Sequence, residues 1–139
     1  MCSSSEAPRR SVAGVVVRNG LVFVGRRKGG GCLDGKWEFP GGKREEGESD
    51  EQALSREYDE EFGLSIRVGR LLGESSFQYA GREYSLAALS ASFDGDPPAL
   101  REHSEVRWTD SAGLLTLDLA DSDRTLLGFV LPLLDAGGR

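Results

Sequence analysis

Negative charge is concentrated in one short segment of this chain, residues 43–61. The segment holds nine acidic side chains against three basic ones, which accounts for the whole formal net charge of −6. Its centre contains no Gly or Pro, begins with a capping box of Ser49 and Gln52, and is followed by Gly63. These signals predict a strong helix over Ser49–Phe62, so the rest of the chain has to fold around an acidic helix.

Three carboxylates of this helix, Glu57, Glu60 and Glu61, fall on one face about 100° wide. The face borders the apolar stripe, which is formed by Leu54, Tyr58 and Phe62. Like charges at this spacing repel, and partial burial raises the cost, whereas Mg²⁺ and Mn²⁺ prefer oxygen ligands of this kind. We therefore expect a metal site here. The other acidic residues are expected to be solvated, namely Glu45, Glu46, Asp50, Glu51 and Asp59.

The length of 139 residues fits one domain, and we place it at residues 11–135 between flexible tails, 1–10 and 136–139. Two apolar runs, Val12–Val17 and Leu21–Val24, flank Asn19-Gly20 and predict a hairpin. Further strands are expected at Trp37–Phe39, Ile66–Leu72, Ser75–Tyr79, Tyr84–Phe93 and Val106–Trp108. Helices are expected at Ser111–Leu115 and Ser122–Leu134, the second shortened by Pro132. The pattern favours an α/β fold with a mixed sheet covered by helices.

Composition excludes several classes of function. Cys2 and Cys32 are expected to be free thiols of a reducing compartment, and the single histidine, His103, excludes a Cys/His zinc site and a catalytic triad. We expect His103 to lie in a solvated loop. The acidic charge argues against a nucleic-acid polymer as partner, and no run reaches the ~18 apolar residues of a membrane span. With no secretory signal at the N-terminus, the expected location is the cytoplasm.

The acidic helix and the loop before it resemble the Nudix box. Its pattern is matched by Gly42, Glu48 and the run from Arg56 to Leu64, with Tyr58 at a position that is usually aliphatic. The preceding Lys36–Lys43 segment is similar to that of MutT-type enzymes and CTP pyrophosphohydrolases. The resemblance implies an α/β/α sandwich around a mixed sheet. It also implies an enzyme that hydrolyses nucleoside triphosphates to a monophosphate and pyrophosphate.

The same resemblance assigns catalytic roles. Mg²⁺, or Mn²⁺, would be held by the Gly41 carbonyl together with Glu57, Glu60, Glu61 and Glu102. Arg56 would orient a carboxylate of the motif, and Glu48 would hold Arg56, hold a water or favour the helix N-terminus. The general base would be Glu57 or Glu102, with Glu105 as a competitor of Glu102.

Substrate contacts are also implied by the resemblance. Arg27 and Arg82 would meet the nucleotide, although either could simply solubilise a strand end. Phe39 and Tyr79 would pack against the base, although aromatic residues that flank a strand could equally belong to the core. Asp123 stands where CTP-hydrolysing relatives have an aspartate and MutT enzymes an asparagine. A carboxylate accepts hydrogen bonds and suits the amino group of cytosine, although Asp123 could equally cap the last helix.

The leading expectation is therefore a monomer that acts on free cytidine or modified-cytidine nucleotides. The alternative within the same chemistry is oxidised purine triphosphates such as 8-oxo-dGTP, the nucleotide-pool sanitation and DNA-repair role of MutT. The alternative from another class is a catalytically silent nucleotide-binding module. Intact motif carboxylates count against that module.

Overall fold

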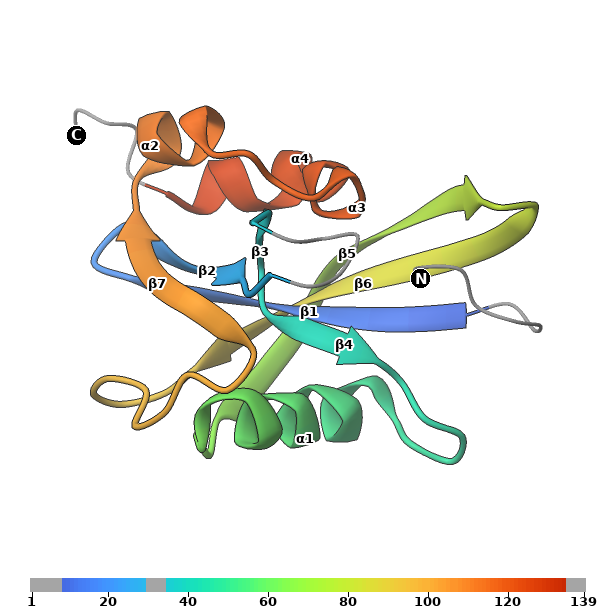
Figure 1. The fold of residues 1–139 in the computed structure, drawn as a ribbon, viewed down its shortest axis with the longest axis horizontal. Helices are drawn as coiled ribbons and strands as arrows, with labels where there is room; N and C mark the ends of the chain where they lie inside the picture. Colours follow the sequence, from blue (N-terminus) through green and yellow to red (C-terminus); the bar gives the residue numbers. More distant parts are fainter. Residues whose placement is uncertain (1–8, 30–34, 135–139) are drawn as a thin grey trace.

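The computed structural model describes residues 9–29 and 35–134. Within these residues seven strands form one mixed sheet with the order β3-β2-β1-β6-β5, and β4 and β7 pair with β1 and β2. The helix α1 covers one face, and α2, α3 and α4 cover the other (Figure 1). The strands are β1 (Arg9–Arg18), β2 (Leu21–Arg27), β3 (Trp37–Glu38), β4 (Gly41–Lys43), β5 (Arg67–Tyr79), β6 (Arg82–Ser92) and β7 (His103–Thr109). The helices are α1 (Asp50–Phe62), α2 (Ser111–Thr116), α3 (Asp121–Arg124), α4 (Leu127–Val130) and the 3₁₀ turn η1 (Leu131–Leu133). This is the predicted α/β/α sandwich.

The acidic helix is confirmed. Ser49 caps α1, its side chain accepts from the Gln52 N–H, and Gly63 ends the helix in the left-handed region at φ 71°. The apolar stripe is fully buried against the sheet. Tyr58, at the unusual position of the motif, packs over Gly14, where any Cβ would come within 2.6 Å of its hydroxyl. The tyrosine therefore changes packing on this face, as expected.

β1 lies at the centre of the sheet. It pairs with β2 through a hairpin in which Asn19 and Gly20 both have positive φ, as expected. It runs parallel to β6 and antiparallel to β4. Its side chains alternate between the faces, so Val12 packs toward α1 and Ala13 toward the other helices.

Two predictions near the N-terminus were wrong. β1 begins at Arg9, so Arg9 and Arg10 belong to the sheet and not to a tail. Asp50 is not a solvated carboxylate, because it forms ion pairs with Arg10 at 2.6 Å and with Arg44 at 2.8 Å. Hydrogen bonds from Arg10, and then its charge, lower the pKa of Asp50 against the effect of burial. The apolar pattern starts only at Val12 and could not reveal these contacts.

Other segment boundaries also differ from the prediction. Gly73 does not end a strand but lies at an irregularity inside β5, where the absent side chain leaves room for the Phe129 ring. Pro40 separates β3 from a further strand, β4, which the sequence did not predict. The last expected helix is divided into α3, α4 and η1, with Pro132 in η1. Among the described residues, none of the helices has the length and apolar character needed to cross a bilayer.

Candidate active site

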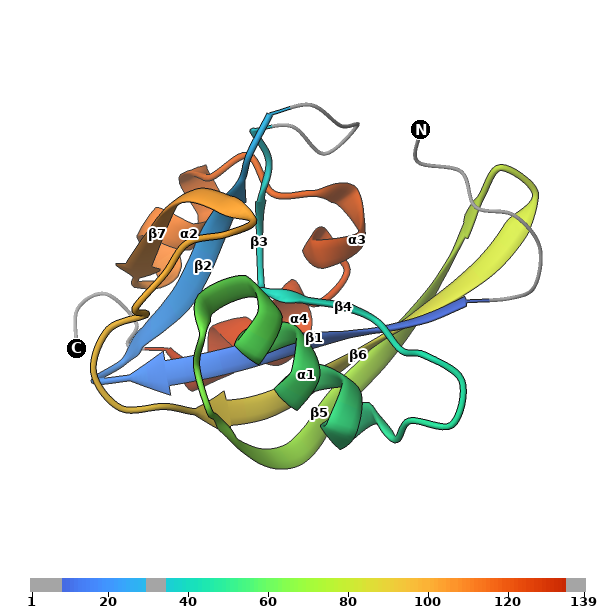
Figure 2. The same cartoon turned by 60° about the horizontal axis from the view of Figure 1, so that its bottom comes forward.

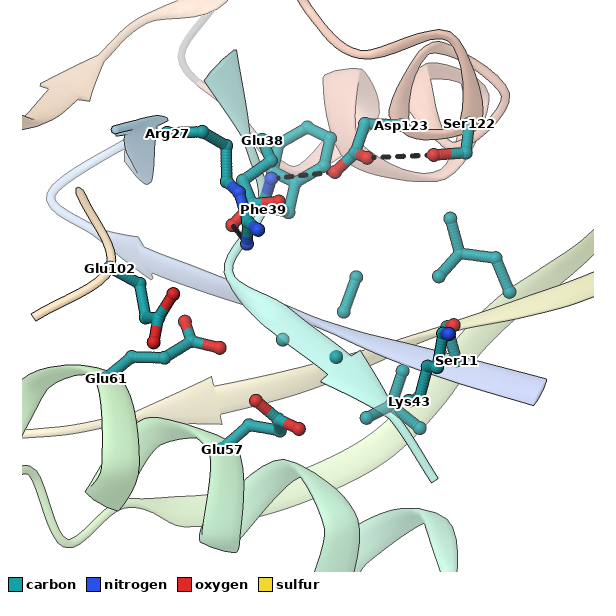
Figure 3. A pocket seen from close by; sticks show the side chains of 15 residues that line it. Ser11, Arg27, Glu38, Phe39, Lys43, Glu57, Glu61, Glu102, Ser122 and Asp123 are labelled. Carbon is teal, nitrogen blue, oxygen red and sulfur yellow. Dashed lines mark hydrogen bonds and ion pairs between the residues drawn. The ribbon is translucent and has the colours of Figure 1, made fainter. Parts of the chain in front are cut away.

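A cleft of about 420 Å³ opens between α1, β4 and the segment that carries α3. β4 runs beside α1 (Figure 2), so its backbone forms the floor between the two sides. One side is acidic and comes from α1 and the loop before β7; the other comes from β2, β3 and α3 (Figure 3). The cleft is lined by Ser11, Val12, Ala13, Arg27, Glu38, Phe39, Gly41, Gly42, Lys43, Glu57, Glu61, Leu86, Glu102, Ser122 and Asp123.

The acidic side brings together carboxylates that are distant in sequence. Glu57 and Glu61 point from α1 into the cleft, and Glu102 reaches the same place (Figure 3). Gly42 makes room for Glu57, because a Cβ there would overlap the Glu57 carboxylate. Glu60 is different: its side chain is 57% exposed and accepts a hydrogen bond from Arg56 at the rim. The structure thus places four of the five expected metal-ligating residues, including Gly41, at the cleft.

Glu61 is the most perturbed of these groups. It is 2% exposed, and its Oε1 has no hydrogen-bond partner among the described residues. Burial raises its pKa well above the usual range, and Glu57 and Glu38 add to the shift. A buried carboxylate oxygen without a donor is costly unless a cation or proton satisfies it. This feature fits a divalent metal held on the acidic side.

Arg56 connects Glu48 to Glu57 on the acidic side of the cleft. Its Nε donates to Glu48 Oε2 at 2.6 Å and its Nη2 to Glu48 Oε1 at 3.0 Å. Its Nη1 donates to Glu57 Oε2 at 3.0 Å. Hydrogen bonds from Arg56 lower the pKa of Glu48 to about 2. Of the roles expected for Glu48, the geometry therefore favours holding Arg56, which in turn restrains Glu57.

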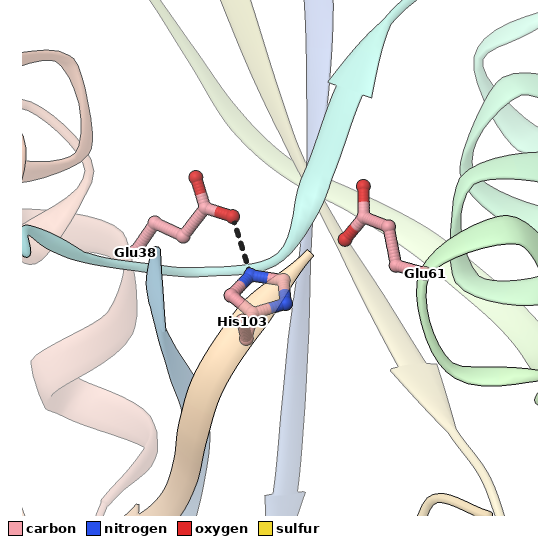
Figure 4. A group of neighbouring side chains, drawn as sticks. All are labelled: Glu38, Glu61 and His103. Atoms are coloured by element: carbon pink, nitrogen blue, oxygen red, sulfur yellow. Dashed lines mark hydrogen bonds and ion pairs between the residues drawn. The ribbon is translucent and has the colours of Figure 1, made fainter. Parts of the chain in front are cut away.

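A buried cluster that the sequence did not predict lies between the two sides. Ligand atoms of Glu38, Glu61 and His103 lie within 4.8 Å of one another (Figure 4). His103 is 1% exposed and its Nε2 lies 2.8 Å from Glu38 Oε2, so the expectation of a solvated histidine was wrong. The reason is that β7 begins at His103, three positions before the expected strand. The position of Glu38 between two aromatic residues of a short strand is the signal that could have revealed its burial.

The far end of the cleft is formed by Asp123 and Phe39. Asp123 does not cap α3, whose N-cap is Ala120; instead its Oδ2 accepts a hydrogen bond of 2.8 Å from the Phe39 N–H. Ser122 donates to its Oδ1. Burial, followed by the nearby Glu38 charge, raises the pKa of Asp123 to about 8. The Phe39 ring is almost wholly buried in the core, although the residue borders the cleft.

One expected substrate contact, Arg82, does not line this cleft. Arg82 starts β6, next to the turn of the long β5–β6 hairpin, and is not among the residues lining the cleft. The side chain of Tyr79 lies outside the part of the chain that the structure describes. Cys2 and Cys32 also lie outside the described residues.

The comparisons with known proteins agree with this geometry. The model of the NUDIX domain family matches residues 8–127. The chain belongs to the Nudix family. It is 35% identical over 116 residues to the "Putative 8-oxo-dGTP diphosphatase 2" of Mycobacterium tuberculosis, with 81% of each chain covered. It is 35% identical over 117 residues to the CTP pyrophosphohydrolase of Escherichia coli, covering 84% of this chain and 86% of the relative.

Solved structures show the same fold. The solution structure of the E. coli ORF135 protein superimposes with a TM-score of 0.80 at 32% identity, covering 91% of this chain and 90% of the other. The protein is thus a Nudix hydrolase of the nucleotide diphosphatase kind. Nudix hydrolases generally use divalent metals, and the oxygen-rich acidic side with its unpartnered Glu61 Oε1 fits such an ion.

Proposed function

We propose that this Nudix hydrolase cleaves nucleoside triphosphates between the α- and β-phosphates, releasing a monophosphate and pyrophosphate. The observation that carries the proposal is the division of one cleft into an acidic side and an end formed by Asp123 and Phe39. Mg²⁺, or Mn²⁺, would be held by Glu57, Glu61, Glu102 and the Gly41 carbonyl, with Glu60 at the rim. When bound, the metal neutralises phosphate charge and polarises the reacting phosphoryl group. We also propose that the enzyme is a monomer acting on free nucleotides in the cytoplasm.

The general base is best assigned to Glu102. Glu57 already accepts a hydrogen bond from Arg56 and is packed against Gly42. The Glu102 side chain is exposed at the cleft and forms no hydrogen bond with the described residues. A base needs a lone pair directed at the attacking water, and if one Glu102 oxygen holds the metal, its second oxygen would supply that lone pair.

Cytosine is the base that Asp123 favours in its ionised form. Oδ2 accepts a hydrogen bond from the Phe39 N–H and Oδ1 accepts one from the Ser122 hydroxyl, so a ligand would use a remaining lone pair of the carboxylate. An ionised oxygen only accepts hydrogen bonds and therefore suits the amino group of cytosine. The CTP pyrophosphohydrolase of E. coli, among the similar relatives, supports this preference.

A second candidate substrate class is supported by the raised pKa of Asp123. A carboxyl group with a pKa of about 8 is mostly protonated at neutral pH, and its hydroxyl can donate to a carbonyl oxygen. An oxidised purine such as 8-oxo-dGTP carries carbonyl oxygens. The similarity to the "Putative 8-oxo-dGTP diphosphatase 2" of M. tuberculosis supports the same substrate class.

A substrate panel at several pH values tests both candidates. With Mg²⁺, hydrolysis of dCTP, CTP, 5-methyl-dCTP, dGTP, 8-oxo-dGTP, dATP and ADP-ribose is measured, and phosphate and pyrophosphate are resolved. We expect pyrophosphate release, and we expect kcat/KM for dCTP relative to 8-oxo-dGTP to rise between pH 7 and 9 as Asp123 ionises. Because this is a ratio, pH effects on the shared chemistry cancel. In Asp123→Asn the ratio should become independent of pH.

The outcomes separate the proposals. A ratio in favour of 8-oxo-dGTP throughout would retain the reaction and replace cytosine by oxidised purines. Phosphate as the first product would refute cleavage at the α/β position. Binding of nucleotides without any turnover would favour the silent binding module.

A further inference from the structure

Three neighbouring strands bring His103, Arg27 and Glu38 together. β7 places His103 opposite Arg27 on β2, just after a register shift, and β3 places Glu38 opposite Gly25 on β2. Glu38 Oε2 lies 2.8 Å from His103 Nε2 and 3.5 Å from Arg27 Nη1. One carboxylate oxygen therefore contacts both a buried imidazole (Figure 4) and a guanidinium that lines the cleft.

Gly25 allows this contact to span the middle strand. Adjacent strands lie about 4.8 Å apart, so side chains on β7 and β3 are separated by the residue between them on β2. That residue is Gly25, and a Cβ there would come within 2.6 Å of His103 Cδ2. The imidazole thus lies over the glycine and reaches the Glu38 carboxylate.

The cluster of Glu38, Glu61 and His103 is expected to lower the stability of the fold. Glu38 is 8% exposed and lies beside the buried Glu61, with Asp123 also buried nearby. Buried charges of one sign destabilise a protein unless they are paired, and apolar residues of similar size would cost less. A purely structural role does not account for an acid at this position. The contact that Glu38 makes with the Arg27 guanidinium at the cleft does account for the acid.

Arg27 supplies the positive charge that pairs with Glu38. We assign His103 Nε2 as the donor of this hydrogen bond, because a carboxylate in contact with a guanidinium acts as the acceptor. The ring also stacks on Phe62 at 5.1 Å and 7°, at the end of the helix that carries Glu57 and Glu61. His103 thus connects the strand that carries Arg27 to the acidic helix.

We propose that His103 and Glu38 are positioning residues for Arg27: His103 fixes the Glu38 carboxylate, and Glu38 holds the guanidinium over the cleft, where it binds triphosphate oxygens. This role rests on the proposed function, because the triphosphate supplies the anion. With Nη1 directed at Glu38, the other N–H groups of the fork can donate to phosphate. Losing this alignment weakens the binding of the substrate and of the transition state equally, so it raises KM more than it lowers kcat.

The test compares His103→Leu, which removes the donor, with His103→Gln, which keeps an N–H near the position of Nε2. With the best triphosphate of the panel, we expect His103→Leu to raise KM about tenfold and to change kcat less than about threefold. His103→Gln should restore KM to within about threefold of the wild-type value. Circular dichroism and Tm identify any variant that has simply lost its fold.

A second variant disturbs the contact between His103 and Glu38 without removing a polar group. Gly25→Ala pushes the His103 ring away from Glu38 and should raise KM as His103→Leu does. Arg26→Gln is the matched control, since that side chain is exposed and its only ion pair among the described residues is with Glu105 at 3.8 Å. It should leave both kinetic parameters unchanged.

A double variant establishes that His103 acts through Arg27. KM of His103→Leu/Arg27→Gln should not exceed that of Arg27→Gln alone, because the two changes remove the same interaction. Fully multiplicative effects, or a wild-type KM in His103→Leu, would overturn the proposal.

Crystal structures of the wild type and His103→Leu separate this proposal from the proposed function. In the variant the guanidinium of Arg27 should leave Glu38, and a retained contact near 3.5 Å overturns the positioning role whatever the enzyme hydrolyses. A wild type that cleaves no triphosphate refutes the proposed function instead, and the position of Arg27 still decides between the two structural outcomes.

Discussion

The acidic residues in and beside the cleft differ most in how their carboxylates are satisfied. Glu48 is held by the Arg56 fork, whereas Glu61 is buried with an unpartnered oxygen. Raising the pKa of a carboxyl group by burial means that its charged form destabilises the fold. A divalent cation reverses this effect because it binds the charged form. Glu61 therefore lowers the stability of the metal-free protein while it favours the binding of a metal ion.

Glu61→Gln tests this opposition. At pH 8 the carboxyl group is ionised in the unfolded chain but burial keeps it protonated in the folded protein, which costs stability; the amide needs no proton, so we expect a Tm above that of the wild type in EDTA at pH 8. The wild type should gain Tm on addition of Mg²⁺, since an ion that binds only the folded state stabilises it. The variant should gain much less. Thermal denaturation with and without Mg²⁺ measures both, and an equal Mg²⁺ response in the two proteins would remove Glu61 from the metal site.

At the scale of elements, local signals were enough for α1 and insufficient for the strands around it. The cap at Ser49 and the stop at Gly63 are encoded within a few residues of the helix ends, and both were predicted. The burial of His103 and Glu38 depends on β7, β2 and β3 pairing across long separations in sequence. No local pattern brings His103 to Glu38, although the aromatic neighbours of Glu38 are a signal of its burial, so the acidic side could be predicted and the cluster beside it could not.

The contact between β4 and α1 gives a prediction at this scale. In Gly42→Ala the new Cβ would overlap the Glu57 carboxylate and displace it from the cleft, while the caps and buried stripe of α1 remain. Displacement of a catalytic group by about 1 Å can cost roughly 100-fold in rate, and we expect a loss of kcat/KM of that order. Gly128→Ala is the control, because its Cβ would meet nothing within 4 Å. Near-normal activity of Gly42→Ala with unchanged Tm would contradict the placement of Glu57.

Across the whole molecule, the fold carries two groups of acids with opposite pKa shifts. Glu48 and Asp50 are paired with arginines and have lowered pKa values, so their contribution to stability is present above their unfolded pKa and lost as the pH falls through the folded value. Burial raises the pKa values of Glu61 and Asp123. Between the unfolded and folded pKa of these two groups the native state binds more protons than the unfolded state, so stability falls as the pH rises.

We therefore expect the metal-free protein to be most stable in mildly acidic solution and to lose free energy of unfolding from about pH 5 to pH 8. In this range Asp123 is ionised in the unfolded chain but still protonated in the folded protein, where its pKa is about 8. One group contributes at most about 1.4 kcal/mol per pH unit. Urea unfolding in EDTA at several pH values measures the slope. Asp123→Asn, which cannot ionise, should flatten it, and Mg²⁺ should flatten it further by binding the charged form of Glu61. A slope that is the same in the variant and the wild type would show that Asp123 is already ionised in the folded protein at pH 5.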